Sequence, residues 1–307
     1  MPYLSLLLFF LTRVSSSVTT KMNSRSFSAF GTTGSFLYVI ETSIFSLLFF
    51  WGMNGFKLFV NPTVTLYSAI YGALVVLNLF CTVFVYNYGS VAMVNFITGT
   101  VSLIAAMISG MLLFGEQMMP DKLLRIGLML VCIFIVLMGA KKNAPMTERE
   151  AKGHSGIHPL AIILPTVMAL ISTCVSAIIK YYSADVSATD SNSLFFMTNL
   201  FSLIYCIPIV FATMKRDKIS PKDIVVICKD KRSAVVFLNT AIGCVQAGVT
   251  ALLLATMDVA VYTPLTSAIG FIALAAATPI VRERLDRYTI SATAVSILSI
   301  VLPEILF

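Results

Sequence analysis

The sequence contains few charged residues for its length. Asp, Glu, Lys and Arg make up 11% of the 307 residues, whereas an ordinary soluble domain carries about 25%. Histidine occurs only twice and tryptophan once, and the six cysteines include no pair in CxxC spacing. The shortage of charge excludes an ordinary soluble protein. The scattered cysteines predict neither a disulfide framework nor a metal site, and we expect no cofactor.

Motifs of catalysis are also missing. The sequence has no nucleophile elbow, no phosphate-binding loop and no redox motif. Both histidines, His154 and His158, stand in or beside a polar stretch, so an embedded catalytic pair is not expected. The net charge of +7 is concentrated in a few short loops, which is the pattern of membrane topology. The sequence therefore predicts neither an enzyme nor a partner of nucleic acid.

Long apolar runs are abundant. Hydrophobic residues form 58% of the chain, and the mean hydropathy is +0.93. A run of about 20 apolar residues crosses a bilayer core of roughly 30 Å as a helix, because backbone in lipid must satisfy its own hydrogen bonds. The predicted fold class is therefore all-α, a polytopic protein embedded in the lipid bilayer. Ten transmembrane helices are predicted, at residues 3–20, 35–55, 65–86, 91–113, 122–140, 159–181, 193–214, 233–256, 259–281 and 288–307.

The first predicted span has a second interpretation. Residues 1–20 combine a short apolar core with small residues after it, as a secretory signal peptide does. They lack a basic segment before the core, however, and Arg13 follows the core at once. The internal repeat described next needs this segment as the counterpart of residues 159–181, so we expect a retained helix.

The chain contains an internal repeat, seen most clearly in residues 90–140 and 258–302. In both stretches a polar residue followed by Val-Ala opens an apolar run, a glutamate closes it, and a spanning helix follows. The closing residues are Glu116 and Glu283. Polar residues match elsewhere in the pairs Asn78 with Gln246, Thr82 with Thr250, Lys21 with Lys180, and Glu41 with Asn199.

The repeat divides the chain into two halves joined by a linker. Residues 1–140 form the first five-helix repeat, residues 141–157 the polar linker, and residues 158–307 the second repeat. Because five is odd, the second half must enter the membrane from the opposite side. Inverted repeats of this kind are an architecture of secondary transporters, whose halves rock around a site near the midplane.

These features resemble the drug/metabolite transporter superfamily, in its ten-span EamA-like form. The resemblance covers nearly the whole chain and is carried by the two five-span halves, by the corners Gly115-Glu116 and Arg282-Glu283, by Gly127, and by Lys21 at the end of the first span. It implies a secondary transporter, an exporter of small polar metabolites such as amino acids, working by alternating access. It also implies a multi-pass protein of a bacterial plasma membrane, with a homodimer as one possible assembly.

Two other functions stay open. Relatives in the same superfamily carry nucleotide sugars or sugar phosphates, although the FYNN and GALNK motifs of GDP-mannose carriers are absent. The first span also lacks the embedded glutamate of the four-span multidrug members. The other alternative is a membrane scaffold that transports nothing, and such a protein has no cavity accessible to a solute.

Charged residues within spans are the main candidates for a transport site, because each costs about 2.5–3.5 kcal/mol to insert. Glu41 lies in the second predicted span and Arg13 in the first. They either line a polar cavity that binds solute or relays a proton, or form a structural ion pair. Lys180 either reaches the same cavity or extends to the membrane interface, as long basic side chains do.

Uncharged polar residues complete the candidate site. Amides in a helix bundle often bridge helices, but the matched placement of Asn78 and Gln246 favours a cavity. Pro264 removes a helix hydrogen bond, so we expect a broken ninth span, and Pro165 and Pro208 could break the sixth and seventh in the same way. The remaining candidates for solute binding or coupling are Asn95, Asn199, Tyr262 and Thr263.

The distribution of basic residues predicts the orientation. The loops after the first, fifth, seventh and ninth spans carry 16 of the 21 Lys and Arg residues. The positive-inside rule then places these loops in the cytoplasm and both termini outside. The resemblance implies the opposite, since relatives commonly have cytoplasmic termini.

Overall fold

The structure of the protein is a computed structural model, and the described residues are the subject of every structural statement below. They are 2–58, 60–86, 88, 91–115, 120–143, 159–185, 191–220, 222–224, 231–256, 262, 265–266, 269–270, 272–273, 276–277, 280 and 287–306. The ninth predicted span, the linker 144–157 and the corner residues Glu116, Arg282 and Glu283 lie wholly or mostly outside them.

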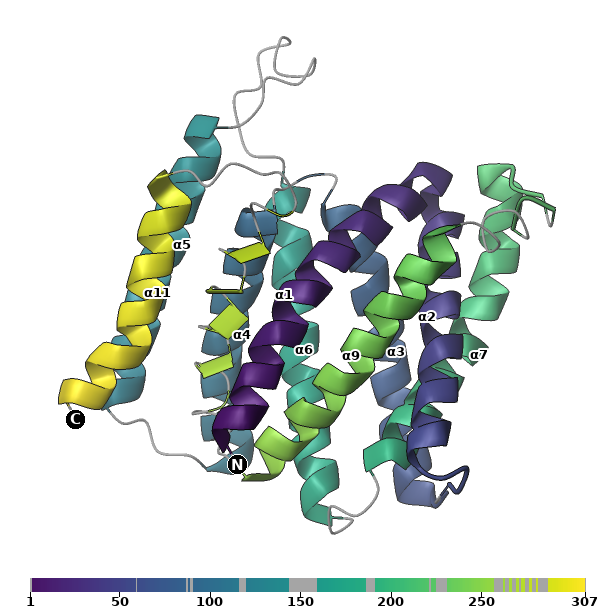
Figure 1. Ribbon diagram of the computed structural model, residues 1–307, viewed down its shortest axis with the longest axis horizontal. Coiled ribbons are helices and arrows are strands. Elements are labelled where there is room, and N and C mark those ends of the chain that lie inside the picture. Colours follow the sequence, from purple (N-terminus) through teal and green to yellow (C-terminus); the bar gives the residue numbers. More distant parts are fainter. Residues whose placement is uncertain are drawn as a thin grey trace. The chain divides into compact units, whose positions relative to one another are not determined.

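The described residues form helices and connecting turns, with no strand among them (Figure 1). The helices are α1 (Pro2–Phe27), the 3-10 turn η1 (Ser28–Phe30), α2 (Gly31–Met53), α3 (Pro62–Val85), α4 (Val91–Phe114), α5 (Pro120–Asn143), α6 (Leu160–Asp185), α7 (Ser191–Asp217), α9 (Lys231–Thr256) and α11 (Arg287–Leu306). Their positions along the chain match the apolar runs of the sequence.

Six helical stretches are long and apolar enough to cross a membrane: Ser5–Met53, Pro62–Val85, Met93–Leu113, Leu160–Tyr182, Ser191–Asp217 and Arg232–Ala255. The first of these joins α1, η1 and α2. Helices α5 and α11 contain shorter apolar segments, Leu123–Gly139 and Ile290–Pro303. The predicted class, an all-α membrane protein, is thus confirmed. The count of ten spans and the inverted repeat remain predictions.

Local sequence sets several helix boundaries. Pro62 stands at the first position of α3, where its missing N–H is not needed. The Asn61 side chain accepts a hydrogen bond of 2.7 Å from the Val64 N–H and caps the helix. Pro165 and Pro208, by contrast, lie inside α6 and α7, and both helices run through them. Neither proline therefore interrupts its helix, although the sequence had allowed for a break at each.

The helices pack into two compact units, and each draws on both halves of the sequence. Unit 1 comprises Met1–Asn87 and Cys174–Met257, and unit 2 comprises Tyr88–Thr173 and Asp258–Phe307. Helix α6 contributes its first part to unit 2 and its second part to unit 1. The units therefore divide the chain differently from the predicted halves, because helices pair mainly across the halves.

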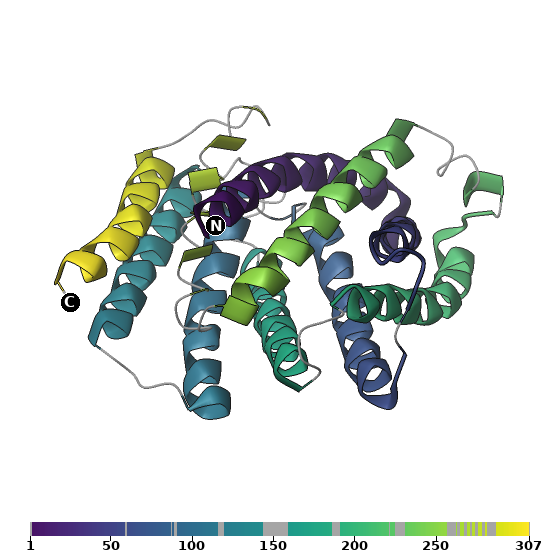
Figure 2. The same cartoon turned by 60° about the horizontal axis from the view of Figure 1, so that its bottom comes forward.

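In unit 1, α2 and α3 pack along α7, and α1 and α2 pack along α9 (Figures 1 and 2). Phe27, Tyr38, Val39 and Val236 belong to its buried apolar core. At the α3–α7 contact, a Cβ atom on Gly72 would lie 2.9 Å from the Thr198 carbonyl oxygen. Glycine at this position therefore allows the two helices their close approach.

In unit 2, α5 packs along α11, and small residues again form the contact. A Cβ atom on Gly139 would lie 2.5 Å from Tyr288 Cβ. Nearby, the Cys132 thiol donates a hydrogen bond of 3.3 Å to the Ala292 carbonyl. The same unit holds α4 against the first part of α6, where the Thr98 hydroxyl donates to the Pro165 carbonyl at 3.4 Å.

Candidate functional site

The carboxylate of Glu41 is buried within a helix that is long enough to cross the membrane. Glu41 lies about 15 Å along α2 from its start and is 7% exposed. The Ser233 hydroxyl, in the first turn of α9, lies 3.3 Å from each of its two carboxylate oxygens. The packing of α2 on α9 therefore places the acidic group between these two helices.

A buried hydrogen-bond network lies along the same helices. The Thr19 hydroxyl of α1 donates to Asn239 Oδ1 of α9 at 2.5 Å, and Asn239 Nδ2 donates to the Tyr38 hydroxyl of α2 at 2.9 Å. The Thr20 hydroxyl also donates to Asn239 Oδ1, at 3.3 Å. We call Thr19, Thr20, Tyr38 and Asn239 the Tyr38–Asn239 network. One amide thus joins three helices.

The network and Glu41 form one polar seam. Tyr38 precedes Glu41 by three residues, so both lie on one face of α2. Lys21 and Asn23 of α1 are also buried, and Lys21 is only 6% exposed. The Asn23 side chain and the Thr42 hydroxyl lie next to the Tyr38 hydroxyl and extend the polar seam on α1 and α2.

An aromatic pocket continues the seam along α2 and α9. It has a volume of about 230 Å³ and is lined by Phe45, Leu48, Phe49, Phe237, Thr240 and Ala241. Phe45 and Phe237 meet edge to face with ring centroids 5.2 Å apart. Each follows a seam residue by one turn, Phe45 after Glu41 and Phe237 after Ser233. Leu48 and Phe237 in its lining are 59% and 56% exposed, so the pocket next to the polar seam is an open, apolar one.

Arg13 does not occupy the place that a Glu41 ion pair requires. It is half-buried in α1, and the described contacts of its side chain do not include Glu41. Its charge acts instead on the Tyr86 hydroxyl, just after α3.

The other predicted site residues divide between the units. Asn78, Lys180, Asn199 and Gln246 are half-buried in unit 1. The Asn199 amide donates to the Phe195 carbonyl of its own helix at 2.8 Å, and Asn78 Oδ1 is buried without a partner among the described residues. In unit 2, Asn95 is half-buried and Tyr262 is buried. Thr263 and Pro264 lie outside the described residues.

Seven residues of the polar seam were absent from the sequence-based set: Thr19, Thr20, Asn23, Tyr38, Thr42, Ser233 and Asn239. Two of them carried a usable signal. Tyr38 lies one helical turn before Glu41, and Asn239 is an amide inside an apolar run. Thr19, Asn23 and Ser233 look like ordinary helix-end residues in the sequence, and only the packing of α1 and α9 brings them to the seam.

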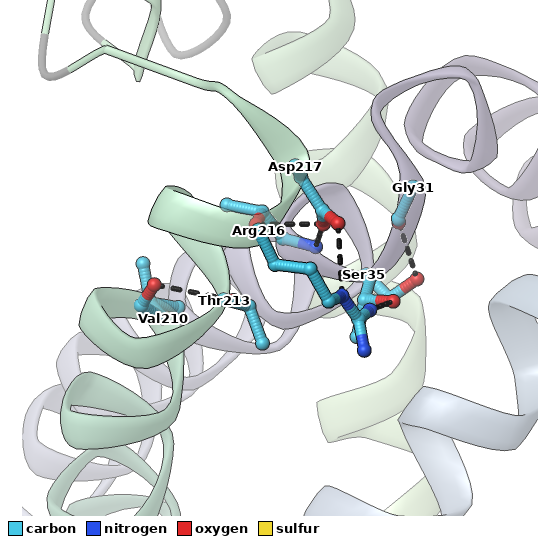
Figure 3. Close-up of polar contacts among 8 residues, drawn as sticks. Gly31, Ser35, Val210, Thr213, Arg216 and Asp217 are labelled. Carbon is cyan, nitrogen blue, oxygen red and sulfur yellow. Dashed lines mark hydrogen bonds and ion pairs between the residues drawn. The ribbon is translucent and has the colours of Figure 1, made fainter.

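A second group of polar contacts joins the end of α7 to the start of α2 (Figure 3). Asp217 Oδ2 accepts hydrogen bonds from the Thr33 N–H at 2.7 Å and from the Thr33 hydroxyl at 2.9 Å. Arg216 Nη2 donates to the Thr32 hydroxyl, and Arg216 Nε lies 3.2 Å from Asp217 Oδ1. We call Thr32, Thr33, Arg216 and Asp217 the charged clasp. A carboxylate at a helix N-terminus is favourable because it meets free N–H groups and the positive end of the dipole.

Gly31 makes room for the charged clasp. It has φ of +65°, a conformation that residues with a Cβ atom rarely adopt, and a Cβ atom there would lie 3.3 Å from Asp217 Oδ2. At the opposite end of the α2–α7 pair, Asn54 Nδ2 donates to the Lys57 carbonyl at 2.5 Å and to the Ser193 hydroxyl at 3.3 Å. No group of three or more metal-ligating side chains occurs among the described residues.

Comparisons with known proteins bear on the fold. No protein-family model matches the sequence, and no curated protein matches it. Solved structures do match, and 27 chains are similar. One, described as "Crystal structure of protein", has a TM-score of 0.62 and 13% sequence identity, over 98% of this chain and 96% of that chain. At this identity the likeness concerns the fold alone. The class defined by fold and composition is an all-α membrane protein.

Proposed function

We propose that the protein is a secondary transporter of the drug/metabolite type, an exporter of small polar metabolites such as amino acids. It works by alternating access between two inverted five-helix repeats. The observation that carries the proposal is Glu41, a carboxylate buried within a membrane-length helix and held at a seam rich in hydroxyls and amides. A bundle that needed only to pack would not require such costly groups.

The helix contacts support the repeat. If the predicted spans are numbered in order, adding five converts α2 into α7, α3 into α9 and α5 into α11. The contacts α2–α9 and α3–α7 then exchange with each other, while α2–α7 and α5–α11 map onto themselves. The α1–α9 contact corresponds to α6–α3, where the rings of Tyr182 and Tyr67 meet at 6.1 Å. A pseudo-two-fold axis produces this exchange.

The polar seam supports a site for solute or proton. It combines an acid, an aromatic hydroxyl, an amide and the hydroxyls of threonine and serine. The neighbouring aromatic pocket offers space for the apolar part of a small solute. Together they match the usual make-up of a small-molecule site, which is mostly apolar with a few convergent polar groups.

The test is efflux from liposomes that contain the purified protein, with a panel of amino acids and an imposed pH gradient. We expect Glu41→Gln to abolish flux driven by the pH gradient while the protein remains folded. Asp223→Asn removes an exposed acid that is not part of the seam and should transport normally. Full transport with normal pH dependence in a well-expressed Glu41→Gln protein would overturn the proposed role of Glu41. No flux of any solute would favour a scaffold.

The buried Lys21 supports a second candidate, a carrier of nucleotide sugars or sugar phosphates, because a buried cation suits a phosphate group. The same liposome panel should therefore include these solutes. Flux of phosphorylated solutes that is lost in Lys21→Gln would favour this candidate over the amino-acid exporter. Labelling of cysteines introduced at Asn78 and Gln246 by water-soluble reagents separates either carrier from a scaffold, in which we expect both positions to be inaccessible.

A further inference from the structure

The last turn of α7 and the residues after it form an ordered basic surface. Lys215 and Arg216 lie in that last turn, and Lys218 directly follows the helix with φ of +55°. The Ile219 N–H donates to the Met214 carbonyl at 3.1 Å, which is the hydrogen bond of a helix that ends at a left-handed residue. The chain therefore turns away from the axis of α7 at Lys218.

The turned segment is held against the apolar core of unit 1. The Asp223 and Ile224 N–H groups donate to the Ser220 carbonyl at 3.0 and 3.3 Å, and the side chains of Ser220 and Asp223 bond to the backbone of the same turn. Ile224 packs against the buried core, whereas Lys218 and Lys222 are exposed. The core contact and the local hydrogen bonds therefore hold the segment that carries these lysines.

An exposed apolar face of α7 leads to this basic surface. Ile204, Ile207 and Phe211 all have exposed side chains, and Phe211 is 68% exposed. They are spaced three and four residues apart, so they share one face of the helix, and Lys215 continues that face four residues after Phe211. Because α7 is long and apolar enough to cross a membrane, this face suits contact with acyl chains, and Lys215 stands where the apolar face ends.

Positive charge predominates on this surface. Lys215, Lys218 and Lys222 are exposed, and the Arg216 side chain is 65% exposed. Residues 215–224 contain four basic and two acidic residues, which gives a net charge of +2. Both acids accept hydrogen bonds from backbone N–H groups, one in α2 and one in the same turn. The acids are thus engaged within the protein, whereas the three lysines are exposed to the surroundings.

The opposite end of the α2–α7 pair has a different surface. Lys57 is the one charged residue between α2 and α3, and Met53 and Phe56 near it in the sequence have exposed apolar side chains. At the basic end, where α7 ends and α2 and α9 begin (Figure 1), Arg232 of α9 adds a further cation, with its guanidinium 5.2 Å from the centre of the Phe30 ring. Positive charge is therefore concentrated at the end of the pair where α7 ends.

We propose that this end of α7 is a binding surface for anionic phospholipid, with the three exposed lysines at the phosphate headgroups and Phe211 at the acyl chains. Each basic residue near a negatively charged membrane surface strengthens the attraction to it about fivefold. Phe211 adds an apolar contact that a soluble phosphate compound has no chains to make. Such binding requires a membrane around α7 but no transport activity.

The test uses purified protein in micelles of a neutral detergent, so that changes of charge cannot alter membrane insertion. Phosphatidylglycerol or phosphatidylcholine is added, and bound lipid is counted by native mass spectrometry. We expect the anionic phosphatidylglycerol to bind about tenfold more tightly than phosphatidylcholine, and this preference to shrink as salt is added. Equal binding of the two lipids would overturn the proposed surface.

Lysine variants place the binding at the end of α7. Lys215→Gln should weaken the binding of phosphatidylglycerol about fivefold, and glutamine at all three lysines on the order of a hundredfold. Arginine at the same three positions should retain binding, because it keeps the charge. Lys57→Gln, which removes a single exposed lysine at the opposite end of the α2–α7 pair, is the matched control and should change the affinity little. Equal losses in Lys57→Gln and Lys215→Gln would show a general attraction and overturn the surface.

Further measurements identify the ligand. Phe211→Ser should weaken the binding of phosphatidylglycerol severalfold. Glycerol phosphate and inorganic phosphate should not displace the lipid, and an oligoglutamate peptide should bind more weakly than phosphatidylglycerol does. Displacement by free phosphate, or tighter binding of the peptide, would overturn the proposal. If the triple glutamine variant does not fold, Lys215→Gln, Lys222→Gln and Phe211→Ser carry the same test singly.

Discussion

Two helix contacts in this protein hold helices together with different chemistry. One is the seam between α1, α2 and α9, and the other is the contact between α5 and α11. In the seam, Asn239 joins three helices through its amide, and Glu41 is buried beside it. At the α5–α11 contact, Gly139 lies directly under Tyr288, and a thiol bonds to a backbone carbonyl. Helices in lipid gain no hydrophobic energy by associating, so close packing and interhelical hydrogen bonds must hold them.

Comparing the two contacts shows which polar groups helix packing requires and which it does not. At the α5–α11 contact two helices dock through glycine, alanine and cysteine, together with Tyr288 and a Ser299 hydroxyl that lies 3.4 Å from Met129 Sδ. The seam docks its helices with groups that are far more expensive to bury, among them the Glu41 carboxylate and the Asn239 amide. The additional polarity of the seam is therefore best explained by a solute or a proton, and the following changes test that explanation.

The largest effect is expected from Gly139→Val at the α5–α11 contact. A Cβ atom there would lie 2.5 Å from Tyr288 Cβ, and overpacking of a closed contact costs about 3 kcal/mol. Gly127→Val is the matched control on the same helix, because a Cβ atom at Gly127 meets no atom within 4 Å. Thermal unfolding in detergent should show a clearly lower unfolding temperature for the variant at position 139 only. Equal stability of the two variants would contradict tight packing at Gly139.

An intermediate effect is expected in the seam. Tyr38→Phe leaves the Asn239 Nδ2 donor buried without its acceptor and should lower the free energy of unfolding by about 1–3 kcal/mol. Asn239→Leu should cost a similar amount. The double variant should cost clearly less than the sum of the two, because removing both partners leaves fewer orphaned groups. Strict additivity in unfolding measurements would show that the hydrogen bond between these two residues contributes nothing.

The smallest effect concerns the loop between α7 and α9. Asp223 Oδ2 accepts a hydrogen bond of 2.8 Å from the Ser220 N–H, and the Ser220 hydroxyl accepts from the Asp223 N–H at 3.4 Å, as in a capping box. The backbone hydrogen bond from Ser220 holds the pKa of Asp223 below its ordinary value of 3.8. This stabilisation is present above pH 3.8 and is lost as the pH falls through the lower folded pKa. Titration of the Asp223 carboxyl by NMR should give a pKa below 3.8, and Ser220→Ala should change it less than a deletion of the turn.

The sequence predicted the helix positions well, because a segment that crosses lipid needs a long apolar run, and such runs are easy to recognise. It misplaced the end of α1, which continues to Phe27 beyond the predicted 3–20. The hydroxyls of Ser17 and Ser26 donate to carbonyls one turn earlier, so polar residues extend the helix without leaving hydroxyls unsatisfied. A hydropathy count cannot register this local satisfaction.

The sequence identified a site residue only where its residue type is rare inside a predicted span. Glu41 stood out as an acid inside a span, and the structure buries it. Asn239 and Tyr38 did not stand out, because their importance lies in an encounter between helices from opposite ends of the chain. The partner of Arg13 was likewise beyond reach of the sequence, since it depends on which face of α1 turns toward α3.

The hydrogen bond between Thr19 and Asn239 has a consequence for biosynthesis, since 220 residues separate its two partners. Because α1 is synthesised before α9, the Thr19 hydroxyl can bond to Asn239 only after α9 has been made. We expect a chain truncated after α7 to leave α1 poorly anchored, so that a cysteine introduced at Thr19 is labelled readily, and addition of α9 to protect it. Equal protection in both chains would show that α1 settles alone. Protection by α9 would mean that α1, the first helix to be synthesised, is among the last to reach its final packing.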